Sequence, residues 1–161
     1  MKKCLLAWYG ITDLGAALGL NDQEGPILAA IKNGDFEELK ILAYTNPQKA
    51  NIQNDSDEFH RFQELSQNTD TIKSLSRDEL MRLIDLFSNT SKAHRRYKKW
   101  IKEKAAELNL LINISMQEEE LLNLNDTTGI YSAGLNSLRS VCEAEEEKQI
   151  FLHISPGTSL M

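Results

Sequence analysis

Short apolar runs alternate with helical segments at both ends of the chain. The runs CLLAWY, residues 4–9, and LKILAYT, residues 39–45, are continuously apolar. Such runs are typical of strands that are covered on both faces of a parallel sheet. Between them, residues 25–34 predict a short helix, with Pro26 at its first position and Gly34 after its end. The N-terminal part therefore predicts a strand, a helix and a second strand.

The central residues 47–109 have a helical pattern instead. Residues 57–67 and 94–108 carry apolar side chains at helical spacing, with Tyr97, Trp100, Ile101 and Leu108 on one side of the second segment. Between these segments, Ser76 and Glu79 have the spacing of a capping box at the start of a further helix. This stretch is longer than a single crossover between parallel strands needs. We interpret it as a helical insertion or an enlarged helical layer.

Predicted strands and helices alternate again in the C-terminal part of the chain. Residues 110–116 predict a third strand, with an extension into residues 117–124 or a displacement by a few residues left open. Residues 149–155 predict a fourth strand, and a helix begins near Asp126. Its apolar face is predicted to contain Tyr131, Leu135, Leu138 and Cys142. The alternation predicts an α/β fold, a Rossmann-like three-layer sandwich with a mostly parallel sheet. The length of 161 residues suits one domain, spanning residues 1–161 with the helical insertion inside it.

Composition and charge narrow the class of protein. The apolar fraction of 41% is that of a soluble domain, and a net charge of -6 argues against a nucleic-acid binder that uses its whole surface. Residues 92–104 form one basic stretch, for which a solvated helix face is the more frequent explanation. Cys4 and Cys142 are isolated, which indicates a reducing compartment. The apolar start is short for a signal peptide and no run spans a bilayer, so we expect a cytoplasmic protein without a membrane partner.

Candidate chemistry lies where the predicted strands end, because open parallel sheets bind ligands at the carboxyl ends of their strands. The segments that follow the strands are rich in hydroxyl, amide and glycine groups: YGITD, TNPQ, NLNDTTG and SPGT. The same residue types are also needed for turns and helix caps, which is the competing interpretation. The three histidines form no metal or catalytic group, and nucleotide-loop and hydrolase motifs are absent from the sequence. We therefore expect no cofactor, no metal and no catalytic residue.

Several segments together resemble the CARF domain, the CRISPR-associated Rossmann fold. In that family a strand leads into a helix through an Asn/Asp motif, and the next strand ends in a Thr/Ser-x-Gly-Thr turn. Here residues 123–141 and 151–161 match these two features, and residues 5–13, 25–31 and 41–46 also fit. The chain departs from the family where Pro156 precedes Gly157 and where Thr127 follows Asp126. Within the family, it is most similar to the N-terminal sensors of sigma-54-dependent, RtcR-type regulators.

The resemblance implies a homodimeric sensor that binds a nucleotide-type ligand, a cyclic oligoadenylate or an RNA end, without turnover. It places the ligand at the loops after the first and fourth strands, and the parts that contact DNA and RNA polymerase beyond residue 161. Control of a nuclease in CRISPR-linked antiviral defence and a ligand-free interaction module are the alternatives. The expected ligand-binding residues are Gly10, Ile11, Thr12, Asp13, Thr45, Asn46, Ser155, Pro156, Gly157, Thr158 and Ser159.

Overall fold

The sheet of this protein has four parallel strands. The structure, a computed structural model, describes residues 1–20, 24–52, 60, 69–121, 123, 126–143 and 147–153. Strand order is β3-β2-β1-β4, and every neighbouring pair is parallel. The predicted α/β, Rossmann-like class is thus confirmed. The strands are β1 (Lys2–Trp8), β2 (Glu38–Thr45), β3 (Asn113–Glu120) and β4 (Lys148–His153).

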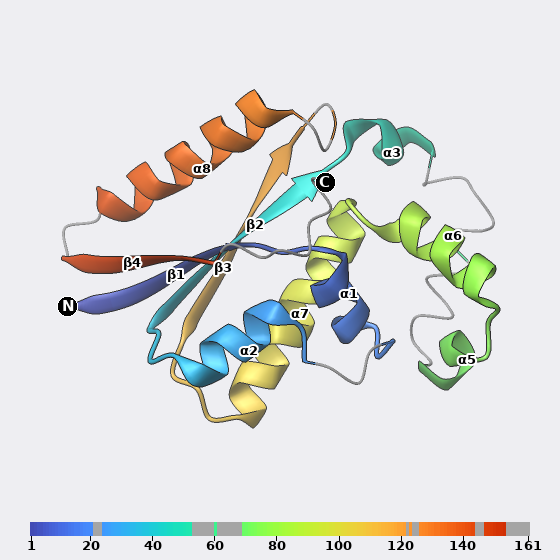
Figure 1. Ribbon diagram of the computed structural model, residues 1–161, viewed down its shortest axis with the longest axis horizontal. Helices are drawn as coiled ribbons and strands as arrows, with labels where there is room; N and C mark the ends of the chain where they lie inside the picture. Colours follow the sequence, from blue (N-terminus) through green and yellow to red (C-terminus); the bar gives the residue numbers. More distant parts are fainter. Residues whose placement is uncertain are drawn as a thin grey trace.

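Helices cover both faces of the sheet and form the outer two of three layers (Figure 1). On one face α1, α2 and α7 contact one another, and α8 lies on the opposite face. Helices α3, α5 and α6 lie to one side, at the right of Figure 1. The helices are α1 (Ile11–Ala17), α2 (Pro26–Asn33), α3 (Pro47–Ile52), α5 (Thr69–Lys73), α6 (Arg77–Phe87), α7 (Ser91–Glu107) and α8 (Thr127–Cys142).

The main core lies between the sheet and the layer of α1, α2 and α7. Side chains alternate between the faces of a strand, so every second residue of β1 and β2 points into this core. Each fully buried Leu or Ile contributes about 1.5–3 kcal/mol relative to an exposed side chain. The core includes Leu5, Ala7, Leu14, Ile27, Ile31, Leu39, Ile41, Ala43, Tyr97 and Ile101.

The third strand begins later than the sequence pattern indicates, at Asn113 rather than at residue 110. The cause is the end of α7. Asn109 has a φ of 55°, and the N–H of Leu110 donates to the carbonyl of Ala105. Together with the bond from the Asn109 N–H to the carbonyl of Ala106, this is a Schellman motif. The residues that close this motif are not available to the strand.

The helices differ from the expectations in several places. The sequence predicted one helix between the first two strands, and the structure has α1, with the sequence ITDLGAA, in addition to it. Helix α8 buries Ala133, Ser137 and Val141, whereas Tyr131 is 70% exposed. Ala133, Ser137 and Val141, which are spaced four residues apart, therefore face the sheet in place of the predicted apolar face that begins at Tyr131. In α7, Leu108 is 41% exposed, although Tyr97 and Ile101 are buried as predicted.

The central helical segment is confirmed where the structure describes it. Ser76 caps α6 by accepting a hydrogen bond from the N–H of Glu79, and the Ser76 hydroxyl donates to the Glu79 carboxylate at 3.1 Å. The helix predicted over residues 57–67 lies outside the described residues, apart from His60. Within the described ranges, no helix is both long and apolar enough to cross a membrane.

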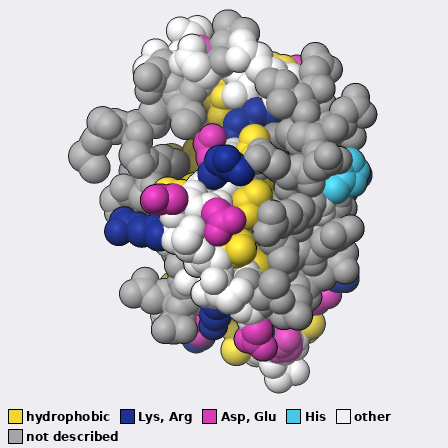
Figure 2. All heavy atoms as spheres, turned by 90° about the vertical axis from the view of Figure 1, so that its right-hand side faces the viewer, with side chains coloured by type: hydrophobic (Ala, Val, Ile, Leu, Met, Phe, Trp, Pro, Cys, Tyr) yellow, Lys and Arg dark blue, Asp and Glu magenta, His cyan; other side chains and the backbone are white. Residues whose placement is uncertain are grey.

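The face of the molecule shown in Figure 2 carries charges of both signs. On this face, the described Lys and Arg side chains lie among Asp and Glu side chains, with apolar side chains between them. The basic stretch on α7 is also partly neutralised, because Lys99 and Lys104 form ion pairs with Glu103 and Glu107. The described side chains on this face therefore favour a solvated surface over a polyanion-binding one.

The Schellman motif at the end of α7 gives a first prediction. Asn109→Val should lower the free energy of unfolding by about 1–2 kcal/mol, because a β-branched residue is strained at positive φ. Asn109→Gly should leave it unchanged or raise it slightly. Urea unfolding measures both, with Lys102→Val on the exposed face of α7 as a control for helix propensity. Equal effects of Asn109→Val and Lys102→Val would contradict the motif.

Candidate functional site

The candidate site lies at the carboxyl edge of the sheet, where the order of the strands reverses. The chain runs from β1 to β2 to β3 in one direction and then returns to place β4 on the other side of β1. Ala7 near the end of β1 is in register with His153 at the end of β4. Ligands of open parallel sheets bind in the crevice at such a reversal. The reversal thus lies at the ends of the first and fourth strands, the position that the family resemblance implies for a ligand.

The structure places the N-terminal site residues after the ends of two neighbouring strands, β1 and β2. Gly10 is the N-cap of α1, and residues 11–13 form the first turn of that helix. Ile11 is 48% exposed, Thr12 is half-buried, and Asp13 is only 1% exposed. Thr45 and Asn46 follow on the neighbouring strand β2, with Thr45 buried and Asn46 half-buried. The predicted residues Ser155, Pro156, Gly157, Thr158 and Ser159 lie outside the described residues.

Asp13 points into the protein and organises the loop around it. Its Oδ2 accepts a hydrogen bond from the N–H of Gly10 at 3.2 Å, and its Oδ1 accepts one from the N–H of Ile27 at 3.0 Å. The hydroxyl of Tyr97 donates to Oδ1 at 3.5 Å. Burial raises the pKa of Asp13, and the two backbone hydrogen bonds oppose this rise. A single carboxylate therefore fixes the start of α1 against the start of α2.

The approach of α2 to Asp13 requires a glycine. Gly25 precedes Pro26 and has a φ of 79° and a ψ of 153°, a region that side-chain-bearing residues rarely adopt. A Cβ at this position would lie 3.1 Å from Oδ1 and 3.3 Å from Cα of Asp13. Gly25 therefore permits both the turn and the close contact that brings the Ile27 N–H to the carboxylate.

A second polar network joins the ends of β1, β2 and β3. The Tyr9 hydroxyl is hydrogen-bonded to Nδ1 of His94, and Nε2 of His94 lies 3.1 Å from Oγ1 of Thr45. The Thr45 hydroxyl donates to Oε2 of Glu118 at 3.4 Å, and the Ser91 hydroxyl donates to the same oxygen at 2.6 Å. His94 is 1% exposed, whereas Glu118 is exposed. The network thus runs from the interior to the surface.

The hydrogen bonds of this network all run in one direction, from Tyr9 toward Glu118. Burial lowers the pKa of His94, so that its ring is neutral and carries one N–H. Burial also raises the pKa of Tyr9, which keeps its proton and donates to Nδ1. The His94 N–H is then on Nε2 and donates to Thr45, whose own hydroxyl proton points to Glu118. The carboxylate of Glu118 is the final acceptor.

Two tyrosines connect this network to Asp13. The rings of Tyr9 and Tyr97 are stacked, with centroids 4.5 Å apart and planes 4° from parallel. Tyr97 donates to Asp13 and Tyr9 donates to His94. Burial raises the pKa of Tyr97, and the negative charge of Asp13 raises it further. The two networks therefore act as one support beneath the loops after β1 and β2.

Sequence reasoning did not find His94, Tyr9, Tyr97, Ser91 or Glu118 as members of a polar cluster. Their partners are distant in the sequence: 85 residues separate Tyr9 from His94, and 49 separate Thr45 from His94. One signal was present. His94 lies on the inner face of α7 with Ala93, Tyr97 and Ile101. A histidine on an otherwise apolar face requires buried hydrogen-bond partners.

The two ends of the carboxyl edge of the sheet differ in charge. The end of β3 carries Glu118, Glu119 and Glu120, and Glu118 and Glu120 are exposed. An anionic ligand would be repelled on this side, because like charges are costly where water is partly excluded. The reversal between β1 and β4 is farther from these carboxylates in the strand order. Within the described part of the chain, no cluster of three His, Cys, Asp or Glu side chains could hold a metal ion.

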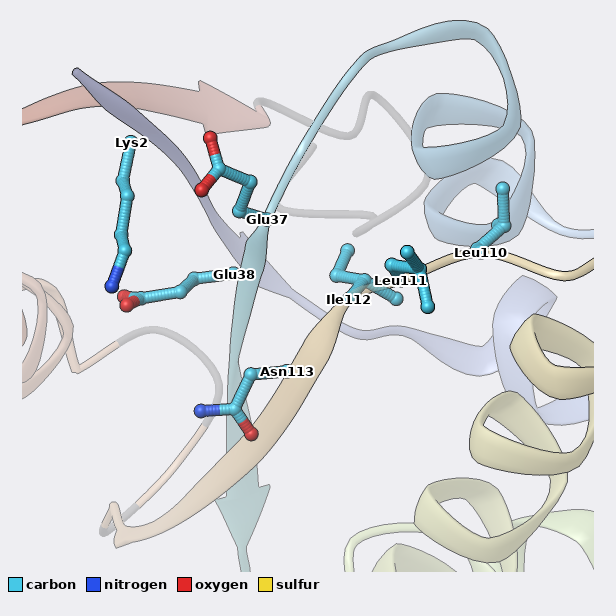
Figure 3. A pocket seen from close by; sticks show the side chains of 7 residues that line it. All are labelled: Lys2, Glu37, Glu38, Leu110, Leu111, Ile112 and Asn113. Atoms are coloured by element: carbon cyan, nitrogen blue, oxygen red, sulfur yellow. The ribbon is translucent and has the colours of Figure 1, made fainter.

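A hollow lies at the amino end of the strands, opposite the candidate site (Figure 3). It is an open groove of about 710 Å³ lined by Lys2, Glu37, Glu38, Leu110, Leu111, Ile112 and Asn113. Figure 3 shows the charged side chains on one side of the groove and the three apolar ones on the other. Leu111 is 96% exposed. The groove lies away from the predicted site and from both polar networks.

The chain matches no protein-family model, and comparisons with curated proteins and with solved structures gave no significant match.

The contact between Gly25 and Asp13 gives a second prediction. Gly25→Ala should lower the free energy of unfolding by about 1–3 kcal/mol, because the backbone is strained and the Asp13 contact is displaced. The matched control is Gly134→Ala in α8, where a Cβ meets no atom within 4 Å. That change should raise stability by up to about 1 kcal/mol through helix propensity. Urea unfolding of both variants checks the contrast, and a neutral Gly25→Ala would refute the proposed role of Gly25.

The buried groups His94 and Asp13 give a third prediction, on the pH dependence of stability. The pKa of His94 is below its usual 6.5 in the folded protein, so the unfolded chain binds the proton first as pH falls. Stability due to His94 is therefore present above about pH 6.5 and is lost below it. Urea unfolding between pH 7 and 5 should show this decline in the wild type and a weaker decline in His94→Gln.

Asp13 should have the opposite effect. Its pKa is raised above 3.8 in the folded protein, so the folded state holds the proton more tightly. Its contribution to stability is present below about pH 3.8 and is lost as pH rises through the raised pKa. Asp13→Asn should remove the loss of stability that accompanies rising pH in the wild type. The two assignments would be contradicted if His94→Gln lost as much stability toward acid as the wild type, and if Asp13→Asn lost as much toward higher pH.

Proposed function

We propose that this chain is a CARF-type sensor domain that binds a nucleotide-type or RNA-end ligand at the carboxyl ends of β1 and β4, without cleaving it. The observation that supports this most directly is the reversal of strand order between these two strands. They are neighbours in the sheet, with Ala7 beside His153. The loop segments that resemble the CARF motifs follow the same two strands in the sequence.

The geometry around the loop after β1 is compatible with a preorganised binding site. Asp13 fixes Gly10 and thereby the path of the chain as it leaves β1. Ile11 next to it is 48% exposed and offers an apolar surface on which a base can lie. A site that is already ordered loses less conformational entropy when the ligand binds. The acidic end of β3 would direct a phosphate-bearing ligand toward β1 and β4.

The remaining parts of the proposal come from the resemblance alone. They are the homodimer, the cytoplasmic location, and a sigma-54-dependent effector that contacts DNA and RNA polymerase through other domains. A CARF-type sensor that controls a nuclease would use the same site. The downstream domain distinguishes the two, since an ATPase with a helix-turn-helix favours transcription and a ribonuclease domain favours defence.

One observation favours a different function, a ligand-free interaction module. Asp13 and Thr45, which the sequence assigned to the ligand, already have partners inside the protein. We therefore regard Asp13 as a positioning residue. In the first loop, Ile11 is 48% exposed and is a described residue that a ligand would touch.

The binding proposal gives a fourth prediction. Ile11→Glu should weaken the binding of cyclic tetraadenylate, or of RNA that ends in a 2′,3′-cyclic phosphate, by about tenfold or more, close to 1.4 kcal/mol. The reason is that a carboxylate would face the ligand's phosphates. Because Ile11 is exposed, the melting temperature of the free protein should change little. Isothermal titration calorimetry measures the affinity.

Met81→Glu is the matched control, because Met81 is 55% exposed on α6. It should bind as the wild type does. If the wild type binds neither ligand, the sensor proposal fails and the interaction module is favoured. If Ile11→Glu binds as tightly as Met81→Glu, the ligand lies elsewhere.

A further inference from the structure

His153 occupies the last position of β4, at the reversal of the strand order. Residues in register on parallel strands point to the same side of the sheet, and the partner of His153 is Ala7. Ala7 belongs to the core beneath α1, α2 and α7. The imidazole of His153 is therefore on the face of the sheet that carries α1 and the loop after β1.

The imidazole has a polar atom without a partner. Nδ1 of His153 is shielded from water and has no hydrogen bond among the described residues. An unsatisfied buried polar group costs about 1–3 kcal/mol, so its presence in a folded protein needs an explanation. His94 provides the contrast, because both of its ring nitrogens are hydrogen-bonded.

The described neighbours of His153 do not supply the missing partner. Asp13 is near enough for the charge of His153 to lower the pKa of Asp13. The Asp13 oxygens, however, accept from Gly10, Ile27 and Tyr97. Two residues before His153, Phe151 lies on the same face and meets Phe36 edge to face, with centroids 5.4 Å apart. The surroundings that the structure describes are thus an occupied carboxylate and aromatic rings.

We propose that His153 contacts the ligand directly, with its Nδ1–H donating a hydrogen bond to a phosphate oxygen of a nucleotide. This inference rests on the proposed function and adds a residue to the proposed site. Residues 7–13 and 150–153 contain no Lys or Arg, and His153 is the one side chain in these two segments that can carry a positive charge. Charge-assisted hydrogen bonds to phosphate are about twice as strong as neutral ones.

Two substitutions of His153 separate the hydrogen bond from the shape of the ring. His153→Asn keeps an N–H group near the position of Nδ1, whereas His153→Phe keeps an aromatic ring and removes the donor. We expect His153→Phe to lose about tenfold or more in affinity and His153→Asn to retain most of it. The melting temperature of free His153→Phe should not fall, because the described residues provide no bond to lose.

The experiment is isothermal titration calorimetry on the full chain. The probes are cyclic tetraadenylate and RNA that ends in a 2′,3′-cyclic phosphate, and the probe that binds identifies the source of the phosphate. If the wild type binds neither probe, the proposed function fails and His153 with it. If the wild type binds and His153→Phe binds equally well, only the role of His153 is overturned. Equal losses in both variants with a lower melting temperature would show a structural role and would also overturn it.

Discussion

The buried carboxylate of Asp13 is the interaction on which the geometry of this edge of the sheet depends. A charge removed from water is costly unless hydrogen bonds replace its hydration. Here backbone N–H groups from the starts of two helices, with the hydroxyl of Tyr97, provide that replacement. Each donor constrains an element: Gly10 the exit from β1, Ile27 the start of α2, and Tyr97 the middle of α7. Gly25 is needed because only a residue without Cβ permits this approach.

The second network extends the same constraint to the neighbouring strands. The hydrogen bonds run in one direction from Tyr9 to Glu118. The position of the proton on each group therefore depends on the hydrogen bond that the previous group donates to it. The last acceptor, Glu118, is exposed to solvent, as is Ser91, which also donates to it. A change of charge at that surface position would therefore be felt at Thr45 and His94. The stack of Tyr9 on Tyr97 joins both networks, so the ends of β1 and β2 and the inner face of α7 form one unit.

The sequence predicted the elements whose local signals agree with their burial. The continuous apolar runs of β1 and β2, the Pro and Gly around α2, and the cap at Ser76 all indicated the observed elements. It failed where tertiary contacts decide. Helix α1 is stabilised by Asp13 and by the core, and α8 turns its small residues toward the sheet. Hydrogen bonds between residues as far apart as Tyr9 and His94 have no local pattern, so the polar support of the site could not be derived from spacing.

The distribution of charge decides which part of the carboxyl edge suits a nucleotide. Beyond β3 the exposed groups are carboxylates, and the hydroxyls nearest to them already donate to Glu118. Between β1 and β4, the carboxylate of Asp13 is buried and already accepts hydrogen bonds from its own donors, and an imidazole nitrogen lacks a partner among the described residues. A phosphate would meet repulsion at the first position and an available donor at the second. The reversal of strand order and the local electrostatics therefore favour the same place, although the two arguments rest on separate observations.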